Sequence, residues 1–218
     1  MKQNQKLNKL LVVSLVLLFP LVIASVSFRQ AAFDLEFYSK EFQQYNPDVN
    51  NALAVTKNLL SYLRFPSAGA DYISSFNEEE TAHLKDVKNL IQAGLWVFYA
   101  SMISMVILGL LFYSVDKKEF LNKMPVITMS GGLLSLIFLA VFKVFTLNFK
   151  DAFVRFHNVF FSQGGWQFPE TYSLVRLFPQ KFFIDIVNLI VLKVLITAVI
   201  LIIAGILIII IKRGMKNG

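Results

Sequence analysis

Residues 89–115 read NLIQAGLWVFYASMISMVILGLLFYSV, twenty-seven positions without a formally charged side chain. Three further long stretches of the 218-residue chain are apolar and have no charged side chain or almost none. About 18 or more apolar residues are enough to cross the roughly 30 Å hydrocarbon core of a bilayer as a helix, in which every backbone polar group is hydrogen-bonded internally. We therefore predict an all-α membrane protein that forms a single integral membrane domain. The four predicted transmembrane helices are residues 10–28, 89–115, 124–147 and 186–211.

The first predicted span also has features of a cleaved signal peptide. Three lysines precede it, and the small residues Ala24, Ser25 and Ser27 lie near its end. Its apolar stretch is longer than the usual signal-peptide core of about 7 to 15 residues. We therefore expect the segment to be retained as a membrane anchor.

The distribution of lysine and arginine predicts the orientation. Residues 1–9, 116–123 and 212–218 hold nine of the 21 Lys and Arg residues in twenty-four positions, whereas residues 29–88 hold six in sixty. Short cytoplasmic segments collect positive charge, so both termini and the turn at 116–123 are expected on the cytoplasmic side. The two long connections, 29–88 and 149–185, are then extracytoplasmic, where we expect them to form a helical, aromatic-rich outer cap.

The net charge of +7 does not indicate nucleic-acid binding. Its excess lies in short segments, and residues 29–88 carry nine Asp and Glu against six Lys and Arg. That pattern is a signal of topology rather than a binding stripe. The absence of cysteine excludes disulfides, thiolate nucleophiles and cysteine metal sites. We expect no nucleic-acid partner and no cofactor.

A short amphipathic helix is predicted in the first long connection. From Asp48 to Leu63, the residues Val49, Leu53 and Leu60 recur near helical spacing, and the sequence FPSAG that follows Arg64 ends the pattern. Such a helix rests on the membrane surface or packs against the spanning bundle.

The stretch FNEEETAHLKDV, residues 76–87, contains one of the only two histidines. Asn77 and Glu80 have the spacing of a capping box, so a helix is predicted to begin here and to continue into the second span. On that helix Glu80, His83 and Asp86 share a face. Flanking carboxylates favour a raised pKa for His83, which suits a general base or an imidazolium donor. The alternative is a solvated acidic helix entrance with an incidental histidine.

The second histidine lies in KDAFVRFHNVFF, residues 150–161, after which SQGG ends any helix. Residues 149–183 contain nine of the 22 Phe together with Trp166 and Tyr172. Aromatic segments with scattered cations between two spans are typical of the headgroup level, where a purely structural interfacial loop is the alternative. His83 and His157 are thus predicted on the same outer side. A metal site would lack a motif such as HExxH, and it would need further ligands from Glu80, Asp86, Asp151 or Asp185.

Three segments together resemble the bacterial family of lipoprotein intramolecular transacylases. They are FNEEETAHLKDV, FHNVFFSQGGWQF at 156–168 and LFPQKFFID at 177–185, and the likeness extends from Ser39 to Asp185 and to the four-span plan. The resemblance implies a membrane acyltransferase of the bacterial cytoplasmic membrane. It would move a fatty acyl chain from the central glycerol ester of a diacylglyceryl-cysteine lipoprotein to the α-amine of that cysteine, leaving a lyso-form lipoprotein.

The residues are compatible with that reaction. A chain with no Cys and no GxSxG motif offers no obvious covalent catalyst, and none is needed when the nucleophile is the amine of the substrate. We expect His83 and His157 to divide the base and acid work. Lys143 and Lys193 could contact a carbonyl or a phosphate beside the substrate. The alternative is that they extend to the lipid headgroups without any role in turnover. The predicted supporting residues are Glu80, Asp86, Asn158, Trp166 and Asp185, and the predicted substrate-binding residues are Lys143, Arg155 and Arg176.

The expected partners are a diacylated lipoprotein and membrane lipids, and we expect a monomer. Two other functional classes remain open at this point. A non-enzymatic membrane scaffold or chaperone would bind a partner through the aromatic outer surface and would tolerate Gln or Asn at both histidines. A metal-dependent membrane hydrolase would lose its activity with a chelator.

Overall fold

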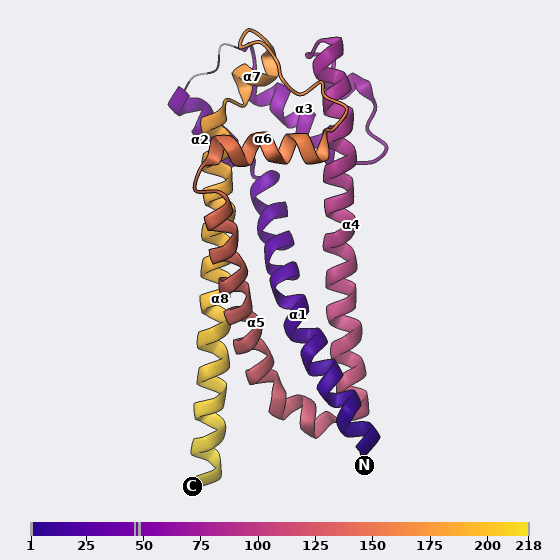
Figure 1. Ribbon diagram of the computed structural model, residues 1–218, viewed down its shortest axis with the longest axis vertical. Helices are drawn as coiled ribbons and strands as arrows, with labels where there is room; N and C mark the ends of the chain where they lie inside the picture. The colour runs from indigo at the N-terminus through magenta and orange to yellow at the C-terminus, as the bar shows by residue number, and fades with distance from the viewer. Residues whose placement is uncertain (1, 46, 48, 218) are drawn as a thin grey trace. The chain divides into compact units, whose positions relative to one another are not determined.

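The structure is a computed structural model that describes residues 2–45, 47 and 49–217. Every regular element in these residues is helical (Figure 1). The chain forms two compact units. The first contains the described residues up to Phe28, Val97–Val144 and the described residues from Ile190 onward. The second contains Arg29–Trp96 and Phe145–Leu189.

Four long helices agree in number and place with the four predicted transmembrane helices, although the predicted third span, 124–147, extends two residues beyond the end of its helix at Phe145. Each is long and apolar enough to cross a membrane. The helix α4 continues without interruption from the acidic stretch at its start into the charge-free segment, as the capping-box pattern predicts. The four helices are α1 Lys2–Ala32, α4 Glu78–Val115, α5 Lys117–Phe145 and α8 Gln180–Asn217.

Close contacts between helix backbones hold the first unit together. A Cβ atom added to Gly132 of α5 would lie 2.7 Å from the carbonyl oxygen of Ala198 in α8, and one added to Gly205 of α8 would lie 2.6 Å from that of Pro125. Because lipid tails are as apolar as the side chains, membrane helices associate through such small-residue contacts rather than through the hydrophobic effect. In addition, a cluster of buried side chains joins α1, α4 and α5; it consists of Leu11, Leu15, Phe112 and Ile127.

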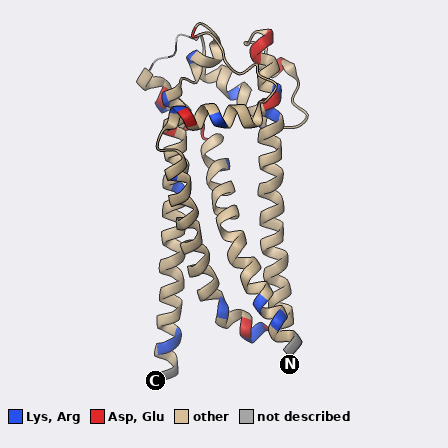
Figure 2. Cartoon of the chain, viewed as in Figure 1, with Lys and Arg blue, Asp and Glu red and all other residues tan. Residues whose placement is uncertain are grey.

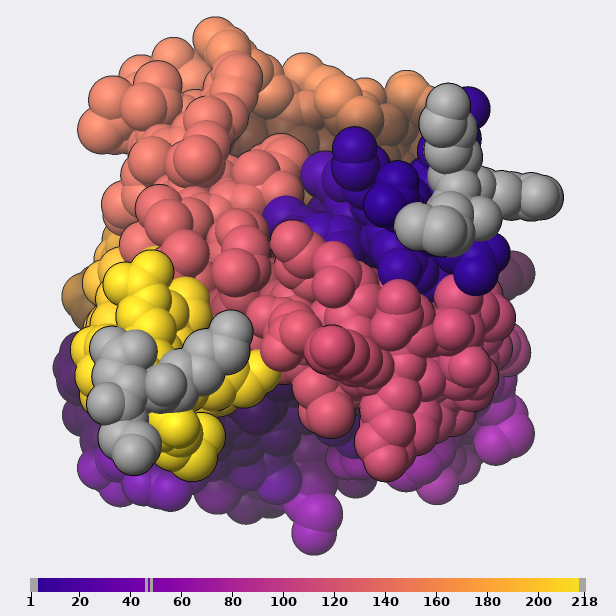
Figure 3. Space-filling view, turned by 90° about the horizontal axis from the view of Figure 1, so that it is seen from below, coloured from indigo at the N-terminus to yellow at the C-terminus, as the bar shows by residue number. Residues whose placement is uncertain are grey.

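The predicted turn at 116–123 is almost entirely helical, which corrects the sequence-based expectation. Helix α4 ends at Val115 and α5 begins at Lys117. Asp116 makes this possible because its side chain accepts a hydrogen bond from the backbone N–H of Glu119 at 2.9 Å, which caps the start of α5. Lys and Arg residues gather at the end of the first unit that holds the start of α1, this junction and the end of α8 (Figure 2), and Figure 3 is a view of this end.

The second unit has a core rich in aromatic side chains. It is built by short helices together with the first turns of α4 and α8. Leu177, Ile73 and Leu84 are at most 2% exposed, and Tyr38 lies 5.1 Å from Phe182 between ring centroids. The short elements are α2 Leu35–Tyr45, α3 Ala52–Arg64, the 3₁₀ turn η1 Ala70–Ile73, α6 Phe149–Phe160 and α7 Ser173–Leu177.

Helix α3 is the amphipathic helix that the sequence predicts. It begins at Ala52, and the predicted start at Asp48 lies outside the described residues. Its apolar side chains Leu59, Leu60 and Leu63 are buried in the core of the second unit, so this face is used for packing within that unit. Helix α2 was not predicted, and it completes the same core with Tyr38 and Phe42.

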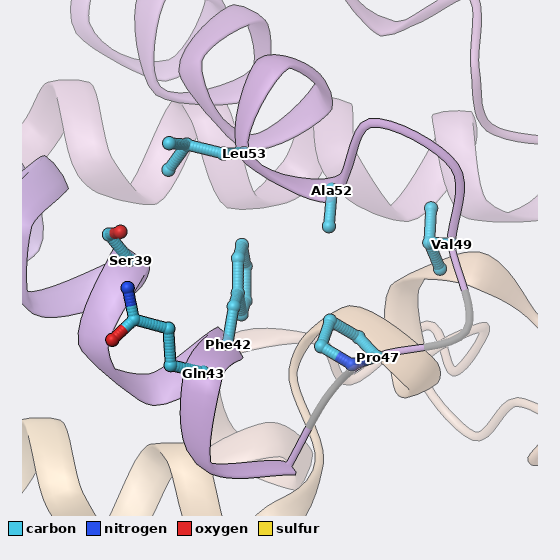
Figure 4. Close-up of a pocket in the computed structure, with 7 residues that line it drawn as sticks. All are labelled: Ser39, Phe42, Gln43, Pro47, Val49, Ala52 and Leu53. Carbon is cyan, nitrogen blue, oxygen red and sulfur yellow. The ribbon is translucent and has the colours of Figure 1, made fainter.

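A shallow pocket lies between α2 and α3 (Figure 4). None of its lining side chains titrates near neutral pH, so the pocket offers no general acid or base, and no histidine lies beside Ser39 in the lining to activate its hydroxyl. The lining residues are Ser39, Phe42, Gln43, Pro47, Val49, Ala52 and Leu53.

Candidate active site

His83 lies in the second turn of α4, on a helix start that is locally determined. The backbone N–H of Asn77 donates to Glu80 Oε2 at 2.9 Å, and the backbone N–H of Glu80 donates to Asn77 Oδ1 at 2.9 Å. This is the reciprocal capping box that the sequence predicts. It fixes the first turn of α4 and therefore the direction in which His83 projects.

His157 is the one buried side chain among the twelve residues of α6. Asn148 caps the start of the helix, because its side chain accepts from the backbone N–H of Asp151, and the helix ends at Phe160, before Gly164 and Gly165. Both glycines have φ near +80°, at 83° and 74°, which side-chain-bearing residues rarely adopt, and they turn the chain back over the helix. In Figure 1, α6 runs roughly perpendicular to the first turns of α4.

The structure brings the two histidines together. Their ring centroids are 6.3 Å apart and the rings lie within 24° of parallel, with the side chains only 7% and 9% exposed. Phe161 contacts both rings, at 4.8 Å from His83 and 5.5 Å from His157. Phe168 lies 5.5 Å from His83, and Trp166 lies 4.7 Å from His157. We call these three side chains, Phe161, Trp166 and Phe168, the aromatic wall of the histidine pair.

Burial reverses the predicted sign of the pKa shift. His83 lies six residues before the charge-free segment that starts at Asn89 and so outside the spanning part of α4. Burial, together with the neighbouring His157, lowers the pKa of His83 to about 4, and Asp86 offsets only part of this effect. Burial also lowers the pKa of His157, against an opposing hydrogen bond to Phe153. The expected raised pKa is therefore wrong, and both imidazoles are neutral at pH 7.

The hydrogen bonds of the two rings differ. His157 Nδ1 lies 2.8 Å from the carbonyl oxygen of Phe153. A carbonyl only accepts, so Nδ1 carries the proton and Nε2 keeps a lone pair. His83 Nδ1 is buried and has no hydrogen-bond partner among the described residues. Because a buried polar atom without a partner is costly, this nitrogen is a natural contact for a polar group of a bound molecule.

Glu80 and Asp86 bind the first turn of α7 and the loop after α6 rather than the imidazole of His83. Glu80 is 1% exposed, and both of its oxygens are used: Oε2 in the capping box, and Oε1 as acceptor from the backbone N–H of Leu174 at 2.6 Å. Asp86 accepts from Gln163 at 2.8 Å. The predicted supporting residues Glu80 and Asp86 are thus next to the site, and they hold its surroundings.

The other predicted site residues are dispersed. Asp185 forms an ion pair with Lys181 at 2.7 Å, while Arg155 and Asn158 lie on the exposed side of α6. Arg176 is half-buried in α7, and Lys143 is an exposed residue of α5 in the first unit. Phe161, Phe168 and Gln163 were not singled out from the sequence. The density of aromatic residues at 149–183 was the signal that pointed to their segment.

Among residues 2–45, 47 and 49–217, no three His, Asp or Glu side chains come together in a way that could hold a metal ion.

Comparison with known proteins identifies the family. The sequence profile described as lipoprotein intramolecular transacylase Lit matches residues 9–183, most of the chain. The chain belongs to the Lit family. The resemblance found from the sequence motifs is therefore confirmed, and Lit membership makes the protein a membrane acyltransferase, a lipoprotein intramolecular transacylase, rather than a non-enzymatic scaffold.

Solved structures share the Lit fold. The membrane integral lipoprotein intramolecular transacylase Lit from Bacillus cereus matches with a TM-score of 0.83 and 21% identity, covering 96% of this chain and 99% of that one. A variant of the same protein, in which a histidine is replaced by arginine, matches with a TM-score of 0.80 and 20% identity, over 96% and 95% of the two chains. An uncharacterized protein from Aquifex aeolicus (strain VF5) is 24% identical over 193 residues, 82% of this chain and 85% of its own.

Proposed function

We propose that this Lit family member transfers one acyl chain within a single substrate molecule. The chain moves from the central glycerol oxygen of a diacylglyceryl-cysteine lipoprotein to the α-amine of the same cysteine, and the product is an N-acyl, S-monoacylglyceryl lyso-form lipoprotein. The observation that supports this most directly is the histidine pair. Two neutral imidazoles lie 6.3 Å apart in an aromatic wall, in a chain without cysteine.

Direct attack by the substrate amine requires little from the protein beyond orientation and proton transfer. The amine and the ester belong to one molecule, and holding such groups in register is worth up to about 7–11 kcal/mol of barrier in well-oriented cases. The carbon–nitrogen bond forms first and gives a tetrahedral intermediate, whose collapse breaks the bond between the acyl carbon and the glycerol oxygen. One proton passes from the amine to that departing oxygen. No acyl-enzyme intermediate is needed.

The tautomers suggest how the two histidines divide this work. His157 has its Nδ1 proton held by the Phe153 carbonyl, so Nε2 is free to accept the amine proton. The reference pKa of an α-amine, about 7.7–8.0, leaves a usable fraction unprotonated near neutral pH. His83 then contacts the oxygen of the tetrahedral intermediate or of the leaving group. Both histidines start neutral, so the proton that one accepts is the proton that the glycerol oxygen finally receives.

The experiment is mass spectrometry of a lipoprotein N-terminus from cells with and without the protein. We expect an acyl group to move from oxygen to nitrogen only when the protein is present. His83→Gln and His157→Gln should each reduce turnover by about 10²- to 10⁴-fold, the usual contribution of a general acid or base. The double variant should lose little more than either single one, because each step uses both groups. Full activity of His157→Gln, or an acyl group trapped on this chain, would contradict the proposal.

The location of the site on the extracytoplasmic face is part of this proposal. It is supported by the lysine and arginine residues at the end of the first unit that carries both termini. Single cysteines at Ser75 and Ser162 should react with a membrane-impermeant thiol reagent in intact bacteria, whereas a cysteine at Asn122 should not. The native chain has no cysteine, so no background labelling interferes. Labelling at Asn122 alone would reverse the orientation.

We also propose that Lys143, Arg155 and Arg176 contact the substrate or its lipid surroundings and that the enzyme acts as a monomer. Cations near the headgroup level attract phosphates and ester carbonyls. Lys143→Leu should reduce turnover while leaving the amount of membrane-inserted protein unchanged. Unchanged turnover would show that Lys143 only extends to the headgroups.

A further inference from the structure

The segment 161–174, which follows α6, is bound to the first turns of α4 by three hydrogen bonds. Gln163 Nε2 donates to Asp86 Oδ2 at 2.8 Å, the Tyr172 hydroxyl donates to Glu79 Oε2 at 3.0 Å, and the backbone N–H of Leu174 donates to Glu80 Oε1 at 2.6 Å. The last two pairs are more than ninety positions apart in the chain. We call these three hydrogen bonds the acidic clasp.

The segment 161–174 carries the aromatic wall. Phe161, Trp166 and Phe168 all lie in this segment, and each ring lies within 5.5 Å of a histidine ring. Residues 161–172 have no regular secondary structure, and a Cβ atom added to Gly164 or Gly165 would meet no other atom within 4 Å. Little within the segment therefore fixes its position, and the clasp supplies that constraint.

Glu80 is the central member of the clasp. It is almost fully buried, and each of its carboxylate oxygens accepts from a different backbone N–H. A carboxylate is the only acidic or amide side-chain group with two accepting oxygens, so glutamine at this position leaves one of the two N–H groups facing an NH₂ group. Glu78, two positions earlier, is exposed and forms none of these bonds, which makes it a matched control.

We propose that Glu80 and Asp86 are positioning residues, which hold the segment 161–174 so that Phe161, Trp166 and Phe168 enclose the two histidines. They act on the reaction through the position of these aromatic side chains around the two histidines, without touching the reacting atoms. The proposal rests on the proposed function for its kinetic test only.

The first test uses fluorescence and needs no substrate. In a Trp96→Phe background, Trp166 is the only tryptophan, and Trp96 is 71% exposed and so easily replaced. Glu80→Gln should move the emission of Trp166 to longer wavelength and increase its quenching by acrylamide, because the segment separates from the histidines. Glu78→Gln should change neither. Identical spectra for the two variants would overturn the role of Glu80.

The second test exchanges donor and acceptor at an exposed bond, where misfolding is of little concern. Gln163→Glu places two carboxylates together and should lower kcat/KM about tenfold to a hundredfold, the usual effect of losing a hydrogen bond to a charged group. Adding Asp86→Asn restores a donor and an acceptor in reversed order with the original net charge. Recovery to within about threefold is expected for the double variant. A double variant no better than Gln163→Glu alone would overturn the positioning role of Asp86.

The two tests separate this inference from the proposed function. If the wild-type protein forms no N-acyl product, the proposed reaction fails, and the fluorescence of Glu80→Gln still decides whether the clasp holds the segment. If the product forms and the fluorescence of Glu80→Gln matches that of Glu78→Gln, the positioning role of Glu80 fails while the reaction stands.

Discussion

His83 is expected to keep a neutral imidazole at pH values where an exposed histidine is almost fully charged. With its pKa lowered to about 4, about 3% of His83 is protonated at pH 5.5, against about 91% for a histidine at the ordinary value of 6.5. The cause is burial beside a second imidazole, because a charged ring there loses its hydration. The folded state therefore binds a proton at His83 less tightly than the unfolded state does. The stability that the neutral His83 ring contributes is complete above pH 6.5 and is lost as the pH falls toward 4.

Two substitutions should move this pKa in opposite directions. Phe161 is 3% exposed and contacts both rings, so Phe161→Ala admits water and should raise the pKa values of both histidines toward 6.5. Asp86 is the one group that raises the pKa of His83, so Asp86→Asn should lower that value further. The aspartate substitution keeps an accepting oxygen for Gln163 and leaves the aromatic wall in place.

The assay is nuclear magnetic resonance of the imidazole nitrogens in histidine-labelled protein, followed as a function of pH. Only two histidines occur in the chain, so one substitution assigns both signals. The nitrogen shifts also report the tautomer, and His157 should show its proton on Nδ1. A wild-type His83 that titrates at or above pH 6.5 would refute the reasoning, since the flanking acids would then outweigh burial.

Three further predictions concern stability in detergent. Burial and the adjacent Asp185 raise the pKa of the Glu41 carboxyl above its ordinary value of 4.5, so the stability that its protonated form contributes is lost as the pH rises from 4.5 through the raised pKa. Glu41→Gln should make the unfolding temperature less dependent on pH above 4.5, and an unchanged dependence would remove Glu41 as its source. Gly132→Ala should destabilise the protein by about 1–3 kcal/mol through overpacking, whereas the matched Gly109→Ala, which meets no atom within 4 Å, should not; equal unfolding temperatures would argue against close packing of α5 on α8. Leu177→Ala, at a fully buried position, should cost about 2–5 kcal/mol in chemical unfolding, and a smaller loss would mean that the core of the second unit repacks.

Local rules were sufficient for the four long helices, for α3 and for the cap of α4. The charge-free stretch at 89–115 could be assigned from its length, because lipid provides no hydrogen-bond partner and a helix satisfies its own backbone. The capping box at Asn77 and Glu80 depends on residues three positions apart, and the structure has it as predicted. The junction at Asp116 is shorter than the predicted turn at 116–123, because the lysines and the glutamate that follow Asp116 favour a helix.

The candidate site was only partly readable from the sequence. The pattern singled out His83 and His157, since they are the only histidines and both flank predicted spans on one side. Their neighbours were less visible: the sequence placed Glu80 and Asp86 on the same helix face as His83 and predicted them as supporting residues. In the structure their oxygens accept hydrogen bonds from Leu174 and Gln163 instead. Such partners lie far along the chain, and spacing within one helix carries no information about them.

The sequence by itself determined the four long helices that can cross a membrane and the amphipathic helix α3, because those outcomes depend on hydrophobicity and hydrogen bonding within a few turns. Only the tertiary structure decided the chemistry of the histidine pair. Sequence neighbours predicted a raised pKa for His83 through Asp86, whereas Phe161 and Phe168, brought in from another segment, bury the ring and lower it. The protonation state of a side chain depends on everything that surrounds it in space, and here hydration lost to distant residues outweighs the charge of a near one.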